Sequence, residues 1–187
     1  MTPDARATLI EELREHALVI GEVTLTSGAP AQYYVDVKRA ILLPVAFRAL
    51  AELVAAEAER LGATAVGGTT MGADPIACAA LAAQAGAGLR AFFVRKERKE
   101  HGLQRWVEGP LLEPGDRCLV VEDVVTTGGS TIKAIDAVRE AGHEVCGVVA
   151  ILDRLAGGSD TIRAAIDGAP YEALTTIDDV YPDRPDR

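Results

Sequence analysis

The chain has 187 residues and a formal net charge of −9, and 49% of its residues are hydrophobic although only 4% are aromatic. This length favours a single domain over residues 1–187, built around one aliphatic core. The acidic charge disfavours nucleic acid as a partner, and the lack of a long apolar run or a signal-like N-terminus predicts a cytoplasmic protein without membrane contact.

The first 40 residues are predicted to form a helix and a pair of short strands. An amphipathic helix is expected over residues 4–20, with Gly21 as its end and with an apolar stripe formed by Leu9, Leu13, Ala17 and Ile20. Short strands are expected at residues 23–25 and 32–37, on either side of a turn rich in glycine and proline. Pro44 is expected to begin a longer helix that ends at Gly62.

From residue 63 onward, short apolar runs alternate with helical patterns. Strands are expected at residues 63–67, 89–94, 117–121 and 145–152, with helices at 74–84 and 130–141. This alternation predicts an α/β fold with a central, mostly parallel sheet flanked by helices. Because ligands bind at the carboxyl edge of such sheets, the loops that follow these strands are expected to meet at one rim.

Residues 95–114 have no apolar period and concentrate positive charge in an otherwise acidic chain. The basic side chains of this segment are Arg95, Lys96, Arg98, Lys99, His101 and Arg105. Long loops inside compact domains are usually functional, and this one joins two core strands, so we expect a mobile lid over the rim. The segment after residue 180 is expected to be frayed, and Cys78, Cys118 and Cys146 lack metal-binding spacing and are expected to be buried.

The most informative stretch runs from Leu119 to Thr131. An apolar strand ends in two carboxylates, Glu122 and Asp123, and a loop of threonine, glycine and serine then opens a helix. Backbone N–H groups and the positive end of the helix dipole suit a phosphate, while the carboxylates suit a polyol or a magnesium ion. The two features side by side predict a site for a phosphorylated sugar.

These features resemble the type I phosphoribosyltransferases, and among them the orotate enzymes. Val120–Thr131 resembles the motif for phosphoribosyl pyrophosphate (PRPP) that is shared by that superfamily. Residues 95–102 resemble the orotate enzymes' Arg-Lys-x-x-Lys-x-His-Gly catalytic loop, and Leu152–Arg154 resembles their orotate-binding corner. Thr24–Gly28 and Tyr33–Asp36 resemble their N-terminal substrate segment. The resemblance implies a small N-terminal hood, about residues 1–40, and a long flexible catalytic loop, about residues 95–110.

The resemblance also implies a reaction: transfer of ribose 5-phosphate from PRPP to orotate, which gives orotidine 5′-monophosphate and pyrophosphate in pyrimidine (UMP) biosynthesis. Lys99, His101 and Asp123 would be catalytic, and Thr126 and Arg154 would bind orotate. Mg²⁺ would be held mainly by substrate oxygens. The residues implied to bind PRPP are Arg95, Lys96, Lys99, His101, Glu122, Asp123, Val124, Val125, Thr126, Thr127, Gly128, Gly129 and Ser130.

Three departures and two alternatives accompany this resemblance. The acidic pair begins with Glu122, where other members have aspartate. Many relatives carry a lysine where this chain has Thr26, and another in the loop where it has Met71, Gly72 and Ala73. A homodimer that shares loop 95–110 between subunits is also implied. The alternatives are a phosphoribosyltransferase for a purine or uracil, and a regulator that only senses PRPP. Arg154 disfavours the first, because a carboxylated base needs a cation, and the chain's short length and acidity disfavour the second.

Overall fold

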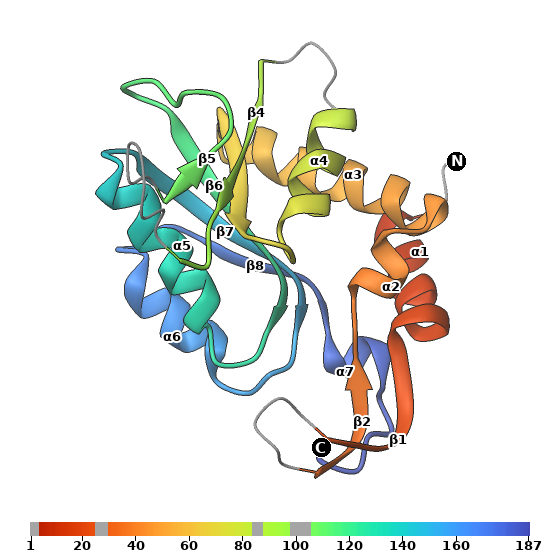
Figure 1. Cartoon of the computed structure of the whole chain (residues 1–187). Helices are drawn as coiled ribbons and strands as arrows, with labels where there is room; N and C mark the ends of the chain where they lie inside the picture. The colour runs from red at the N-terminus through yellow and green to blue at the C-terminus, as the bar shows by residue number, and fades with distance from the viewer. Residues whose placement is uncertain (1–3, 25–29, 84–87, 98–105) are drawn as a thin grey trace.

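A six-stranded sheet forms the centre of the structure, a computed structural model that describes residues 4–24, 30–83, 88–97 and 106–187. The strand order is β5-β4-β3-β6-β7-β8. All neighbouring pairs are parallel except β4 and β5, as Figure 1 shows. The strands are β3 (Ala65–Thr69), β4 (Arg90–Val94), β5 (Val107–Glu108), β6 (Arg117–Val125), β7 (Glu144–Asp153) and β8 (Tyr171–Thr176). The predicted mostly parallel α/β fold is confirmed.

Helices cover both faces of this sheet, because its strands are apolar on both sides. Leu119 and Val121 of β6 belong to one core together with α1, α3 and α4, whereas Val120 belongs to a second core with α5 and α6. These helices are α1 (Ala5–Glu12), α3 (Pro44–Arg60), α4 (Asp74–Ala83), α5 (Gly129–Glu140) and α6 (Gly158–Ala165). Alternate residues of one strand therefore stabilise opposite layers.

The N-terminal region departs from the predicted single helix. After α1 and a π-helical turn, η1 (Leu13–Ala17), the chain enters the strand β1 (Leu18–Thr24), which pairs with β2 (Pro30–Val35) in a separate antiparallel hairpin. Leu9, Leu13 and Ala17 are buried as expected, but Ile20 is 64% exposed. The prediction that Gly21 ends a helix is wrong: the register shifts between Ile20 and Val23, so Gly21 lies in an irregularity of the strand. Strand pairing with β2 overrides the helical period there.

Two further expectations are corrected. Cys78 is exposed, since the buried residues of α4 lie on either side of it (Ile76, Ala77, Ala79 and Ala80), whereas Cys118 and Cys146 are buried. The C-terminal segment is packed rather than frayed. Tyr181 lies edge-on to the ring of Tyr33 at 5.3 Å, and the hydroxyl of Tyr33 donates to Asp186 at 3.0 Å.

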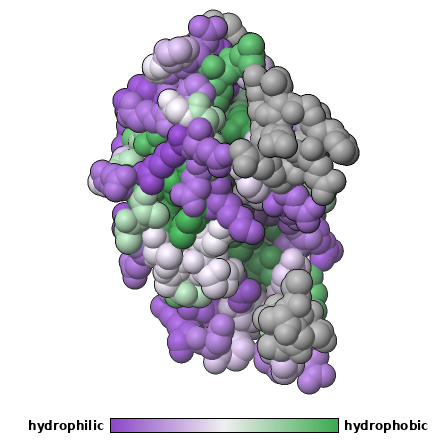
Figure 2. All heavy atoms as spheres, turned by 60° about the vertical axis from the view of Figure 1, so that its left-hand side comes forward, coloured by the Kyte–Doolittle hydropathy of each residue, from purple (hydrophilic) through white to green (hydrophobic). Residues whose placement is uncertain are grey.

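Two short helices complete the structure: α2 (Lys38–Ile41), which follows the hairpin, and α7 (Ile177–Val180), which follows β8. On the face shown in Figure 2, hydrophobic side chains lie in separate areas among hydrophilic ones. None of the helices within the described ranges is long and apolar enough to cross a membrane.

Candidate active site

The acid pair lies near the carboxyl end of β6, which runs four residues further than the sequence predicts. Glu122 is only 4% exposed, and it accepts hydrogen bonds from the hydroxyls of Ser130 at 2.5 Å and Thr131 at 3.0 Å. The Asp123 side chain is 13% exposed, and its Oδ1 accepts from the backbone N–H of Val124 at 2.9 Å. The two neighbouring carboxylates therefore have different partners.

Burial raises the pKa of Glu122 from its ordinary 4.5 to about 7. The hydrogen bond from Ser130 opposes this shift, and the negative charge of Asp123 adds to it. Glu122 therefore titrates near neutral pH, and its carboxyl links the strand to the first turn of α5.

The loop after β6 presents an uncapped helix N-terminus. Gly128 takes the left-handed conformation, with φ of 83°, and no side chain caps the start of α5. Thr126, Thr127, Gly129 and Ser130 are all exposed around this turn. Free N–H groups at the positive end of a helix dipole form a ready-made anion site. The geometry is that of a phosphate cradle.

Gly158, the first residue of α6, packs directly behind this loop. A Cβ atom at Gly158 would lie 2.6 Å from the carbonyl oxygen of Thr126 and 2.9 Å from the backbone nitrogen of Gly128. The cradle is therefore supported by a close backbone contact that only glycine allows.

Arg154 lies beside the cradle, since it follows the neighbouring strand β7. Its backbone N–H donates to the carbonyl of Val125 at 2.9 Å, and its guanidinium lies 5.0 Å from the ring centre of Tyr33. The buried Asp153 accepts from the N–H of Leu155 at 2.8 Å and from the hydroxyl of Tyr171 at 2.9 Å. These contacts fix the backbone on both sides of Arg154 at the rim.

Lys38 of α2 reaches the acid pair from the hairpin side. Its ammonium lies 2.9 Å from Oδ2 of Asp123 and 3.0 Å from Oδ1 of Asp36. Burial alone would lower the pKa of Lys38, but hydrogen bonds and charge attraction to both carboxylates outweigh it and raise that pKa. Gly72, in the loop before α4, packs on the same carboxylate: a Cβ there would lie 2.5 Å from Oδ1 of Asp123.

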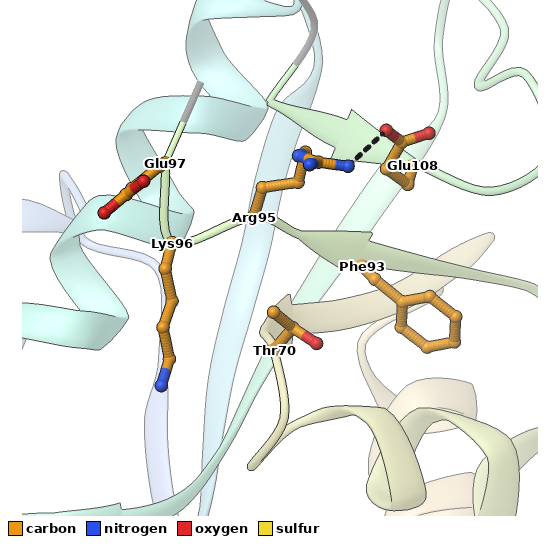
Figure 3. Close-up of a pocket in the computed structure, with 6 residues that line it drawn as sticks. All are labelled: Thr70, Phe93, Arg95, Lys96, Glu97 and Glu108. Carbon is orange, nitrogen blue, oxygen red and sulfur yellow. Dashed lines mark hydrogen bonds and ion pairs between the residues drawn. The ribbon is translucent and has the colours of Figure 1, made fainter. Parts of the chain in front are cut away.

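A pocket of about 540 Å³ lies at the start of the basic segment. Figure 3 shows Arg95 turned toward Glu108, with which it forms an ion pair at 3.0 Å, whereas Lys96 points the other way. The lining residues are Thr70, Phe93, Arg95, Lys96, Glu97 and Glu108. Lys99 and His101 lie outside the described residues, as does Thr26.

The structure thus brings most of the described candidate residues to one edge of the sheet. Glu122 and Ser130 are in contact, and Val125 is bonded to Arg154. Val124 is partly buried and packs on the core, and Val125 is 1% exposed, so both contribute backbone rather than side-chain groups. Lys38 was not predicted: an acid and a base two residues apart, directly after a strand, indicate the local ion pair with Asp36 but not the contact with Asp123.

Three comparisons with known proteins give the same answer. Residues 59–169 match the phosphoribosyl transferase domain family. An orotate phosphoribosyltransferase of Corynebacterium glutamicum is 48% identical over 177 residues, which cover 95% of this chain and 94% of that relative. A crystal structure of the orotate phosphoribosyltransferase of Mycobacterium tuberculosis superposes with a TM-score of 0.83 at 40% identity and covers 96% of this chain and 99% of that one. The same Mycobacterium tuberculosis enzyme in complex with PRPP superposes with a TM-score of 0.78 at 36% identity, over 95% of this chain and 99% of that one.

Proposed function

The chain belongs to the orotate phosphoribosyltransferases, and we propose that its rim carries out this family's reaction, the transfer of ribose 5-phosphate from PRPP to orotate with release of pyrophosphate. The observation that carries the proposal is the bond between Val125 and Arg154. It joins the ends of two adjacent strands, so that the anion cradle, the acid pair and Arg154 lie at the same edge of the sheet. A phosphorylated ribose and an anionic base require these groups together.

In this proposal the cradle binds the 5′-phosphate. The N–H groups of residues 126–130 donate to its oxygens, and the exposed hydroxyls of Thr126, Thr127 and Ser130 lie around it. Asp123 accepts from the ribose hydroxyls and stabilises the positive charge that develops on the ribosyl carbon as the leaving group departs. Glu122 already accepts from Ser130 and Thr131, so it supports the cradle as well as the ribose.

The departing pyrophosphate is assigned to the basic segment. Arg95 and Lys96 lie at its beginning, and Lys99 and His101, outside the described residues, would complete the cation set and supply the proton. A single preorganised donor is worth about 3 kcal/mol of barrier, so replacement of Lys99 by alanine is expected to slow turnover by roughly a hundredfold. No covalent intermediate is required, because positioning and charge stabilisation carry the reaction.

Mg²⁺ is proposed to enter with the substrate. Among the described residues, no group of three histidine, cysteine or acidic side chains could hold a metal ion. Glu122 is buried, and Asp123 already accepts from Lys38 and from the N–H of Val124, so most ligands would come from pyrophosphate and ribose oxygens. The bound ion would neutralise charge on the pyrophosphate.

Arg154 is proposed to pair with the carboxylate or a ring carbonyl of orotate, and Thr126 to donate its hydroxyl to the same ring. A planar guanidinium matches a carboxylate with two parallel hydrogen bonds. We further propose a cytoplasmic homodimer in which loop 95–110 reaches the neighbouring subunit's site; this rests on the family and on the position of Arg95 at the rim.

A spectrophotometric assay tests the reaction. Orotate absorbance is expected to fall when PRPP and Mg²⁺ are added to the protein, and to fall much more slowly when the ion is removed by a chelator. Adenine, xanthine and uracil serve as alternative acceptors. Turnover of one of these bases without turnover of orotate would contradict the proposal.

A further inference from the structure

Lys38 joins two carboxylates from different parts of the molecule. Asp36 follows the hairpin strand β2, whereas Asp123 lies near the end of the central strand β6. The ammonium lies at 3.0 Å from the first and 2.9 Å from the second. The ion pair between Lys38 and Asp123 is thus a direct polar contact between the N-terminal region and the acid that is proposed to bind the ribose.

The Asp123 carboxylate is held from three directions. Lys38 binds Oδ2, the backbone N–H of Val124 binds Oδ1 at 2.9 Å, and Gly72 packs against Oδ1. A carboxylate has about four lone-pair positions, so two hydrogen bonds fix its plane and leave acceptor capacity toward the rim. The rotamer of Asp123 is therefore set before any substrate arrives.

Gly72 leaves room for the Asp123 carboxylate in its present orientation. A Cβ atom at this position would lie 2.5 Å from Oδ1 and 2.6 Å from Cγ of Asp123. A side chain at this position would therefore displace the carboxylate as it stands. The lack of a side chain at Gly72 and the hydrogen bond from Lys38 both favour the present orientation of Asp123.

We propose that Lys38 is a positioning residue for the transfer reaction: it orients the Asp123 carboxylate toward the ribose hydroxyls of PRPP and couples the N-terminal hairpin to the ribose site. The inference rests on the proposed function of Asp123. It does not require Lys38 to touch the substrate, since the effect is transmitted through the carboxylate. Asp36 supports it by holding the ammonium from the other side.

Steady-state kinetics with separate titration of each substrate tests this role. Lys38→Met is expected to lower kcat/KM for PRPP by about tenfold to a hundredfold, because a misplaced group costs that much, while KM for orotate changes little. Lys38→Arg should restore most of the loss. Gly72→Ala, which disturbs the same carboxylate from the other side, should reproduce the loss. Lys133→Met, at an exposed position of α5, is the matched control and should behave as wild type.

A double-mutant cycle between Lys38 and Asp123 distinguishes a positioning role of Lys38 from a general loss of structure. In the Asp123→Ala background, Lys38→Met is expected to have almost no further effect, because the side chain that Lys38 positions is gone. Equal losses in both backgrounds, equal effects on both substrates, or an unaffected Lys38→Met enzyme would each overturn the inference.

If wild-type protein does not consume orotate, the proposed function fails on its own. Calorimetric titration of PRPP into the same four variants then decides the role of Lys38: weaker binding in Lys38→Met supports it, and unchanged binding overturns it.

Discussion

At the scale of residues, the site depends on how each carboxylate is satisfied. Glu122 is buried and accepts two hydroxyl hydrogen bonds from the start of α5. Asp123 is more exposed and is held by Lys38. The two adjacent carboxylic acids therefore differ in chemistry. Burial raises the pKa of Glu122, whereas the ammonium of Lys38 forms an ion pair with Asp123.

The raised pKa of Glu122 predicts a pH-dependent stability. The folded protein keeps the proton to about pH 7, whereas the unfolded chain releases it near the ordinary value of 4.5, so the stabilising contribution is lost as pH rises through that window. Between about pH 5.5 and about pH 8.5, the free energy of unfolding of wild type should fall relative to Glu122→Gln by about 2 kcal/mol.

Urea unfolding of both proteins at several pH values measures this difference. Glu172→Gln, at an exposed position of β8, is the control and should follow wild type. Parallel stability curves for wild type and Glu122→Gln would show that Glu122 does not titrate in this range.

Arg154 is proposed to select the base. Its replacement by alanine removes a charge-assisted pair, so KM for orotate should rise about tenfold or more, while KM for PRPP stays within about twofold. Lysine should restore only part of the loss because it lacks the planar fork. Arg163, whose guanidinium lies 4.9 Å from the ring of Tyr171, is a matched control in a similar arginine–tyrosine pair. Equal effects of Arg154→Ala and Arg163→Ala would argue against a specific role.

At the scale of elements, the cradle depends on α6 as much as on the loop itself. Gly158 lies close to the backbone of residues 126 and 128, and the exposed N-terminus of α5 lies on the other side of that loop. A shift of the loop would turn its N–H groups away from a phosphate. Helix packing behind the loop is therefore part of the anion site.

Gly158→Ala tests this support. The added methyl group overlaps the carbonyl of Thr126, so we expect a loss of about 1–3 kcal/mol of stability from overpacking. Binding of inorganic phosphate, measured by calorimetry, should weaken several-fold. Ser159→Ala, one residue further along α6, should leave both quantities unchanged. Phosphate binding that is equally strong in both variants would show that α6 does not set the cradle.

The elements of the sheet could be predicted from sequence because their apolar runs are buried on both faces. Between Pro44 and Leu152 the predicted strands and helices were found, although β6 runs four residues further than expected and β5 lies in a segment that was expected to be a loop. The hairpin strand β1 was expected only at residues 23–25, because Leu18–Ile20 fits a helical period and only pairing with β2 decides otherwise. The elements α6, β8 and α7 were missed because they have weaker patterns, and their places follow from packing.

The site was predictable where its residues adjoin in sequence. Glu122, Asp123 and the loop to Ser130 are one motif, and the strand-end rule brought Arg154 beside it. Lys38 is 85 residues from Asp123, and no local pattern specifies that contact. The same is true of Gly158, whose contact with the loop follows from the packing of α6.

At the scale of the whole molecule, the N-terminal and C-terminal segments form one structural unit beside the sheet (Figure 1). Tyr33 contacts Tyr181 and Asp186 and also lies under the guanidinium of Arg154. Lys38 makes a second connection, to Asp123. The N-terminal segment therefore contacts Arg154 and Asp123, which are proposed to bind the base and the ribose, and the C-terminal segment packs on Tyr33.

A shared loop predicts complementation between inactive subunits. At an orotate concentration well below the wild-type KM, Arg154→Ala and Lys99→Ala proteins should each have low activity. Co-expressed, they should recover about a quarter of wild-type activity, because half of the dimers would be mixed and each mixed dimer of this symmetric kind holds one intact site. The measurement is orotate consumption by the purified mixture. Activity no higher than the average of the two parents would contradict loop sharing.

The central claim is that one edge of the sheet holds the whole of PRPP. A crystal structure of the complex with PRPP and Mg²⁺ tests it most directly. The account predicts the 5′-phosphate on the N–H groups of residues 126–130, the ribose hydroxyls on Asp123 with Lys38 still attached, and Lys99 of one subunit within reach of the pyrophosphate. A phosphate bound away from the start of α5, or a Lys99 that neither subunit brings near the pyrophosphate, would contradict the account.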